Sequence, residues 1–100
     1  MLYGSIRRYR IRSGTVSEIA ESVKAGLLPI LEKTPGFVSY YIINADSNRA
    51  TSFTVGESHE AVNEMNRVAI KWVADNLPER LSEPEVIAGP LPVAHVQQRV

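Results

Sequence analysis

Two stretches of the chain repeat apolar residues at the spacing of an amphipathic helix. The first begins at Thr15, which stands three residues before Glu18 in the spacing of a capping box. The second begins at Ser58, a residue type that favours a helix N-cap, and it ends at Pro78. The apolar positions that mark the two faces are Val16, Ile19, Ala20, Val23 and Leu27 in the first stretch and Ala61, Val62, Met65, Val68, Ala69, Trp72, Val73 and Leu77 in the second. Gly26 and Pro29 predict a kink or a break in the first helix near residues 25–29.

Four other segments have the composition of strands. They cover residues 2–12, 36–45, 50–56 and part of 85–96, where Pro90 and Pro92 restrict the last strand to an edge, a bulge or a tail. The polar run "NADSNR" joins the second and third as a hairpin. The order β-α-β-β-α-β predicts an α+β, ferredoxin-like fold: a four-stranded antiparallel sheet with two helices on one face, as a single domain over residues 1–100.

The second strand, "FVSYYII", does not alternate between apolar and polar residues. Simple alternation would place Phe37, Tyr41 and Ile43 on one side of the sheet, with Val38, Tyr40 and Ile42 on the other. Two helices can cover only one side, so the other would expose a large apolar patch. The pattern therefore predicts a homodimer that joins two copies through this sheet face.

Composition and charge exclude several classes of partner. Eleven basic residues balance eleven acidic ones, which predicts neither a nucleic-acid partner nor an anionic membrane partner. There is no cysteine, no apolar run long enough to span a membrane, and the arginines of "MLYGSIRRYR" interrupt any signal-peptide core. These features predict a soluble cytoplasmic protein.

The chain resembles the antibiotic biosynthesis monooxygenase-like family of dimeric α/β-barrel proteins. The resemblance rests on "GLLPILEKTPGFVSYYII" and "SFTVGESHEAVNEMNRVAIKWVADNL", and it spans roughly residues 3–95. It implies that the sheets of two subunits close into a shared barrel. Some members oxidise polycyclic or quinone-type aromatic compounds with molecular oxygen and no metal or flavin, some degrade haem, and many have no known activity.

The chain departs from this family at several positions. The haem-degrading members use an asparagine in the first strand and a later histidine, whereas this chain has no asparagine in residues 1–12 and no histidine between His59 and His95. Many relatives end strand three in a bulky aromatic residue, where this chain has Gly56. The glycine either enlarges a cavity or marks a bulge.

Five residues are candidates for a substrate-binding site between the sheet and the helices. Arg7 has the opposite strand parity to Arg8, Arg10 and Arg12, so it is either a cavity residue that binds a ligand anion or a buried ion-pair partner. Asn66 borders the apolar stripe of the second helix, and Trp72 lies within it, so each either lines the pocket or has an ordinary exposed or core position. Tyr40 and Tyr41 face opposite ways, so one meets the helices and the other the dimer partner.

The sequence contains no pattern for a metal or a nucleotide cofactor. His59 and His95 lack paired carboxylates at ligand spacing, and there is no phosphate-binding loop or nucleophile motif. We therefore expect no metal and no cofactor. Two functions remain: a cofactor-independent monooxygenase of a small aromatic or quinone-type substrate, or a non-catalytic homodimer that binds a small apolar molecule.

Overall fold

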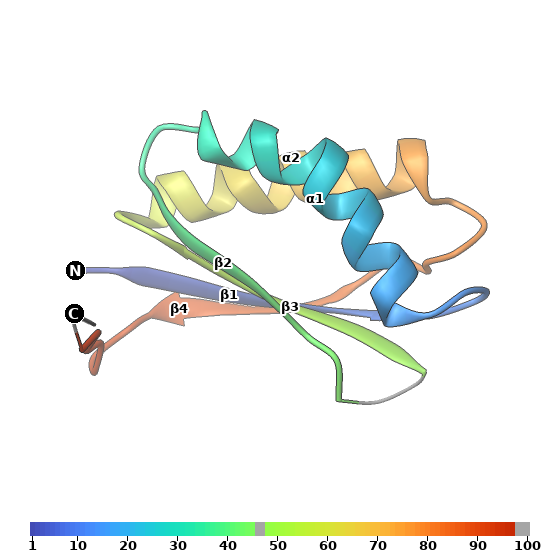
Figure 1. Cartoon of the computed structure of the whole chain (residues 1–100). Helices are drawn as coiled ribbons and strands as arrows, with labels where there is room; N and C mark the ends of the chain where they lie inside the picture. Colours follow the sequence, from blue (N-terminus) through green and yellow to red (C-terminus); the bar gives the residue numbers. More distant parts are fainter. Residues whose placement is uncertain (46–47, 98–100) are drawn as a thin grey trace.

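A computed structural model of the chain describes residues 1–45 and 48–97 (Figure 1). The elements are β1 (Tyr3–Arg10), α1 (Val16–Glu32), β2 (Phe37–Ile43), β3 (Arg49–Gly56), α2 (His59–Asn76) and β4 (Glu85–Pro90). This is the β-α-β-β-α-β order that the sequence predicts.

The strands of the described residues form one antiparallel sheet in the order β2-β3-β1-β4, with β1 and β3 at its centre. Both helices cover the same face of this sheet, and the opposite face is left open (Figure 1). The ferredoxin-like prediction is confirmed. β4 lies at an edge, and Pro90 is its last residue, where a missing backbone donor is tolerated.

Both helices start at the predicted caps. The Thr15 hydroxyl accepts a hydrogen bond from the Glu18 amide at 3.2 Å, and the Glu18 carboxylate accepts one from the Thr15 amide at 3.0 Å. At α2, the Ser58 hydroxyl accepts from the Ala61 amide at 3.1 Å. These bonds satisfy amide groups that have no partner inside the helix.

The predicted break in α1 does not form. The helix is continuous from Val16 to Glu32 with Pro29 inside it, although its axis bends along its length (Figure 1). Leu27 and Leu31 are fully buried on either side of Pro29, so core packing holds the helix together across the lost hydrogen bond. Gly26 is explained by a close approach, because a Cβ atom there would lie 2.4 Å from Cζ2 of Trp72.

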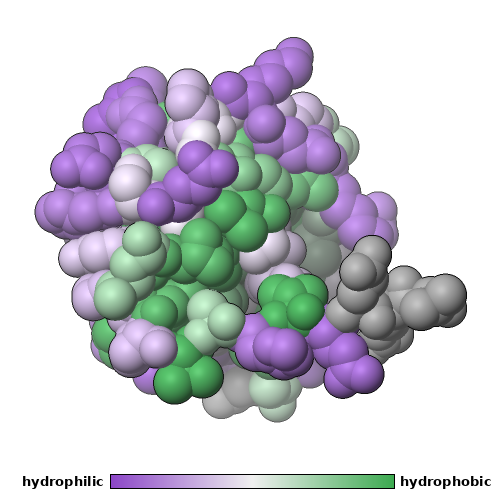
Figure 2. Space-filling model, turned by 90° about the vertical axis from the view of Figure 1, so that its left-hand side faces the viewer, coloured by the Kyte–Doolittle hydropathy of each residue, from purple (hydrophilic) through white to green (hydrophobic). Residues whose placement is uncertain are grey.

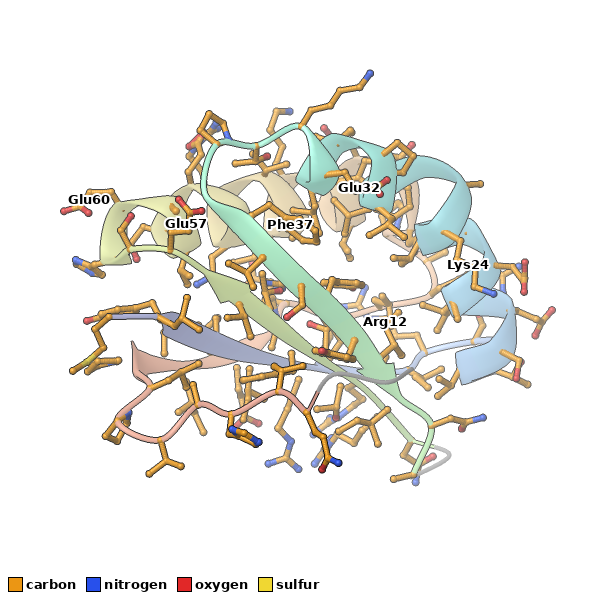
Figure 3. The ribbon with its side chains drawn as sticks, turned by 60° about the vertical axis from the view of Figure 1, so that its left-hand side comes forward. Arg12, Lys24, Glu32, Phe37, Glu57 and Glu60 are labelled. Carbon is orange, nitrogen blue, oxygen red and sulfur yellow. The ribbon has the colours of Figure 1, made fainter. Side chains whose placement is uncertain are left out.

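A bulge in β2 changes which residues face the helices. The register with β3 shifts between Phe37 and Ser39, so that Phe37 packs against the helix-side core together with Tyr40 and Ile42 (Figure 3). The prediction that Phe37 shares a side with Tyr41 and Ile43 was wrong. The extra residue of a bulge reverses the alternation beyond it, and a period of two cannot detect this.

Gly56 lies opposite this bulge and leaves no space behind it. A Cβ atom at Gly56 would lie 2.8 Å from Cγ2 of Val62 and 3.2 Å from Cε of Met65. The glycine therefore allows α2 to pack closely on the end of β3, and it does not enlarge a cavity. Within the part of the chain that the structure describes, no helix is both long and apolar enough to cross a membrane.

Candidate ligand site

The site is built from a polar cluster in the middle of the helix-covered face. Every buried polar side chain among the described residues belongs to this cluster: Ser5 and Arg7 from β1, Ser52 and Thr54 from β3, and Asn66 from α2. The two central strands place them together because residues of one parity on each strand point to the same face.

Arg7 is the centre of the cluster and is only 1% exposed. Its Nη1 atom donates to Oδ1 of Asn66 at 2.6 Å, and its Nη2 atom donates to the Thr54 hydroxyl at 3.1 Å. The Ser5 hydroxyl donates to the same Asn66 oxygen at 2.8 Å. These neutral groups orient the guanidinium, but none of them carries a negative charge.

Arg7 has no ion-pair partner among the residues that the structure describes. In residues 1–45 and 48–97, the ion pairs are Lys24–Glu21, Arg67–Glu64 and Lys71–Asp75, all on helix surfaces. Arg7 is therefore not the buried ion-pair partner that the sequence left open as an alternative. A buried charge without a counter-charge is costly, so its presence here calls for an explanation.

A small apolar cavity lies beside Arg7. It has a volume of about 20 Å³ for the centre of a water-sized sphere, which is room for about one water molecule. The sheet contributes Arg7, Tyr9, Tyr40, Ile42, Ala50, Thr51 and Ser52 to its wall, α1 contributes Ile19, Val23 and Leu27, and the α2 side contributes Val73 and Leu81.

Three polar atoms of the cavity wall make no hydrogen bond of good geometry: Arg7 Nε, the Tyr9 hydroxyl and the Ser52 hydroxyl. They are the only buried side-chain nitrogen or oxygen atoms without such a bond in the described part of the chain. Tyr9 lies near enough to Arg7, and Tyr40 near enough to Ser52, for a weak hydrogen bond to offset slightly the rise in pKa that burial gives each tyrosine. Unsatisfied groups of this kind are rare in folded proteins because each loses its bonds to water.

The two tyrosines beside Arg7 are neutral at physiological pH. Burial raises the pKa of Tyr9 and of Tyr40, and the nearby Arg7 guanidinium lowers both by a smaller amount. The Arg7 guanidinium also lies 6.0 Å from the centre of the Tyr40 ring. The tyrosines therefore offer hydroxyl groups and an aromatic face to the guanidinium, without neutralising it.

Two surface grooves share walls with the cavity. One, of about 240 Å³, lies between α1 and β2 and is lined by Ala20, Val23, Lys24, Leu28, Tyr40 and Ile42. The other, also about 240 Å³, lies at the end of α2 and includes Tyr9, Arg12, Val73 and Leu81. Lys24 and Arg12, one from each groove, are labelled in Figure 3. The first groove is the more apolar, since Lys24 is its only charged residue.

The structure brings together three of the five candidate residues. Arg7 and Tyr40 line the cavity, and Asn66 is buried behind Arg7 as its hydrogen-bond acceptor. Tyr41 is 53% exposed on the open face, where its ring stacks on Phe53. Trp72 lies against Gly26 of α1 and lines neither the cavity nor the two grooves. Its part in ligand binding stays a prediction.

Sequence reasoning missed Tyr9 and Ser52. Tyr9 shares the strand parity of Arg7, so it could have been assigned to the same face. Ser52 and Thr54 alternate with Phe53, a polar pattern that reads as solvent exposure and is in fact buried under the helices. Only the strand register shows that Ser52 lies directly opposite Arg7.

The described residues contain no group of three or more histidine, aspartate or glutamate side chains placed to hold a metal ion. His59 packs against Tyr3 with ring centres 5.0 Å apart and the rings tilted by 37°, and it contacts the Asn63 side-chain amide at 3.0 Å. His95 is exposed near the end of the chain.

Comparison of the sequence with family models and with curated proteins finds no match. Comparison of the structure finds several matches. SnoaB, a cofactor-independent oxygenase from Streptomyces nogalater, is 19% identical, with 93% of this chain and 95% of that chain covered and a TM-score of 0.71. A monooxygenase from the gene ActVA-Orf6 of Streptomyces coelicolor, solved with the ligand nanaomycin D, is 14% identical over 96% and 92%, with a TM-score of 0.72.

A third match, NE2512 of Nitrosomonas europaea, is a protein of unknown function. It is 15% identical, with 98% of this chain and 96% of that chain covered and a TM-score of 0.77. At these identities the comparisons establish the fold, which this chain shares with antibiotic biosynthesis monooxygenase-like proteins. They support the resemblance that the sequence indicated.

Proposed function

We propose that this protein is a monooxygenase that oxidises a small aromatic or quinone-type substrate without a cofactor. The observation that carries the proposal is the apolar cavity between the sheet and the helices, with a buried cation in its wall. Clefts that are mostly apolar and contain a few polar groups are typical of small-molecule sites. The shared fold with SnoaB and the ActVA-Orf6 monooxygenase supports the same assignment.

The reaction needs only the substrate and one molecule of oxygen. An activated ring methylene loses its two hydrogen atoms and becomes a ring carbonyl, so the substrate gives up four electrons. One oxygen atom enters the product as the carbonyl oxygen, and the other leaves as water with the two hydrogen atoms. The protein binds and orients the ring, excludes bulk water and stabilises the electron-rich form of the substrate.

The cavity alone is too small for a ring system. It admits about one water-sized atom, whereas the groove between α1 and β2 offers about 240 Å³ by the same measure and shares Val23, Tyr40 and Ile42 with it. We place the ring in this groove, with one oxygen substituent reaching the cavity. Tyr40 and Ile42 then form the floor, and α1 covers the ring from above.

Oxygen uptake tests the proposal. Purified protein is mixed with an anthrone, which has the activated ring methylene, and oxygen consumption is measured against the spontaneous reaction, with catalase present to detect released peroxide. We expect stoichiometric uptake and the anthraquinone as product. Binding of the anthrone without uptake above the spontaneous rate would favour the non-catalytic binding protein instead.

Two tryptophan substitutions on α1 test the placement of the ring. Ala20 lines the groove, and Ala25 is exposed elsewhere on the same helix. Ala20→Trp should fill the groove and lower the oxidation rate about tenfold or more, since bulk in a binding cleft excludes the substrate. Ala25→Trp is the matched control and should leave the rate unchanged. Equal rates for both variants would rule out this groove.

We also propose that the open face of the sheet binds a second copy of the chain. A row of apolar residues crosses all four strands at directly opposed positions: Tyr41, Phe53, Ile6 and Ile87. Tyr41 is 53% and Ile87 65% exposed. Figure 2, which views the molecule from the side, shows hydrophobic residues gathered in the middle and lower left, with hydrophilic residues above them and at the lower right. A two-fold dimer that buries about 1,600 Å² or more would cover this surface.

A further inference from the structure

We propose that Arg7, together with the Tyr9 and Ser52 hydroxyls, binds a single negatively charged oxygen of the ligand. The ligand is then an aromatic compound with an acidic hydroxyl group, held as its phenolate or enolate. If the function proposed above is correct, this ligand class is also the substrate class. The binding itself does not depend on turnover.

The charge of the cluster requires an anion. Arg7 is 1% exposed, its side chain contacts only neutral oxygen atoms, and the neighbouring tyrosines are neutral. A buried guanidinium in such surroundings is far less stable than one that faces a counter-ion. A ligand that brings a negative charge to the cavity supplies the missing counter-ion.

The unsatisfied hydrogen-bond groups belong to residues that line the same cavity. Arg7 Nε can only donate, and the Tyr9 and Ser52 hydroxyls can each donate, so all three can give a hydrogen bond to one acceptor. All three residues line the same cavity. An anionic oxygen accepts such bonds more strongly than a neutral one.

The size of the cavity selects the kind of anion. A volume of about 20 Å³ accepts one water-sized oxygen atom, not a tetrahedral phosphate or sulfate group. The adjoining α1–β2 groove is apolar and suits the body of a planar ring. This combination fits a phenolate or enolate oxygen on an aromatic system, and a carboxylate on the same ring is the nearest alternative.

Binding of lawsone tests the inference. Lawsone is a hydroxynaphthoquinone that is ionised at neutral pH, and its methyl ether has nearly the same shape without the charge. We expect wild-type protein to bind lawsone about tenfold or more tightly than the ether, because hydrogen bonds to a charged group are the stronger ones. Naphthoic acid distinguishes a carboxylate from a phenolate and should bind more weakly than lawsone.

Arg7→Met should abolish the preference for lawsone over its ether. Arg67→Met is the control, since Arg67 is exposed on the helix surface and pairs with Glu64. The thermal midpoint of Arg7→Met should equal or exceed that of wild type, because a buried charge without a counter-ion is replaced by an apolar side chain. A purely structural Arg7 would instead lower it. Arg7→Lys should keep part of the preference.

Tyr9→Phe tests the anion site independently, in case the arginine variants do not fold. The Tyr9 hydroxyl makes no hydrogen bond of good geometry, so its loss should lower stability little, yet it should weaken lawsone binding severalfold. Equal affinity of wild-type protein for lawsone and its ether would overturn the inference, whatever the result for oxygen uptake. Preferential lawsone binding without oxygen uptake would support the anion site and contradict only the monooxygenase.

Discussion

Near the middle of the sheet, its two faces reverse the usual distribution of polar and apolar residues. On β1, the helix-covered face carries Ser5, Arg7 and Tyr9, all buried, whereas the open face carries Ile6 next to Phe53 and Ile87 of the neighbouring strands, with the exposed Arg8 and Arg10 beyond it. An isolated domain would place the charge outside and the aliphatic residues inside. The reversal is explained if each face has a partner, a ligand anion on the inner face and a second chain on the outer face.

The largest effect is expected from breaking the outer face. Tyr41→Asp places a charge at the β2 end of the apolar row, and a two-fold dimer would bury it twice. We expect the dimer dissociation constant to rise about 1,000-fold, or ~4 kcal/mol. Sedimentation equilibrium at micromolar concentration should find dimeric wild type and monomeric variant.

The control for this change is Ile30→Asp on α1, since Ile30 is exposed away from the sheet. It should remain dimeric. A wild-type protein that sediments as a monomer at these concentrations would contradict the pairing of open faces.

The next largest effect concerns the inner face. Asn66→Ala removes the oxygen that accepts from both Arg7 and Ser5, and it should lower the free energy of unfolding by about 3 kcal/mol. Adding Arg7→Met to the Asn66→Ala variant should recover most of that loss, since the unsatisfied charge is then gone. Urea denaturation measures all three proteins. Failure of the double variant to recover would mean that the cluster stabilises the fold by itself.

Trp72→Ala should have a smaller effect on stability. It tests whether Trp72 serves the packing of the helices or the ligand site. The ring is partly buried against Gly26, so its loss should cost about 2 kcal/mol, less than for a fully buried tryptophan. Because Trp72 lies outside the cavity wall, lawsone affinity should change less than about twofold. A large loss of affinity at unchanged stability would instead place the ligand beside Trp72.

The smallest effect is a change in alkaline stability. Burial raises the pKa of Tyr9 above 10.0, so the unfolded chain loses this proton at a lower pH than the folded one. The contribution of this tyrosine to the free energy of unfolding is therefore fully present below about pH 10. It falls as the pH rises, by at most about 1.4 kcal/mol per pH unit for each such tyrosine. Tyr9→Phe should make this slope shallower, and Tyr40→Phe should reduce it further. Denaturation between pH 9 and 11 that gives parallel slopes would contradict the burial.

The sequence predicted the fold well because its signals are local. Thr15 and Ser58 mark helix starts by hydrogen bonds within one turn, and the apolar stripe of α2 is legible from spacing alone. Arg7 stood out through strand parity, a property that a sequence shows directly. The bulge at Phe37–Ser39 has no comparable signal, because it arises from the pairing of two strands.

The rest of the site could not be predicted because it depends on contacts between distant segments. Ser52 faces Arg7 only through the β1–β3 register, and Asn66 reaches Arg7 from a helix 59 residues away along the chain. Trp72 was predicted to line a pocket opened by a kink or break of α1 near Gly26 and Pro29. The Trp72 ring lies close against Gly26, a contact between two helices that no local pattern shows, and its part in ligand binding stays a prediction.

The most direct test of the anion site is the ionisation of a bound hydroxyl group. Juglone is a hydroxynaphthoquinone that is neutral at pH 7 and changes colour on ionisation, and a chain without cysteine does not react with it through a thiol. The titratable groups of the cavity wall are Arg7 and Tyr9 from β1 and Tyr40 from β2, and the adjoining α1–β2 groove adds Lys24 from α1. An absorbance titration of bound juglone measures the pKa of its hydroxyl.

We expect Arg7 to lower this pKa by about one unit or more relative to free juglone, and Arg7→Met to raise it, because desolvation alone disfavours the anion. A pKa that rises on binding to wild-type protein would show that burial outweighs the guanidinium. That result would contradict the assignment of the inner face as an anion site.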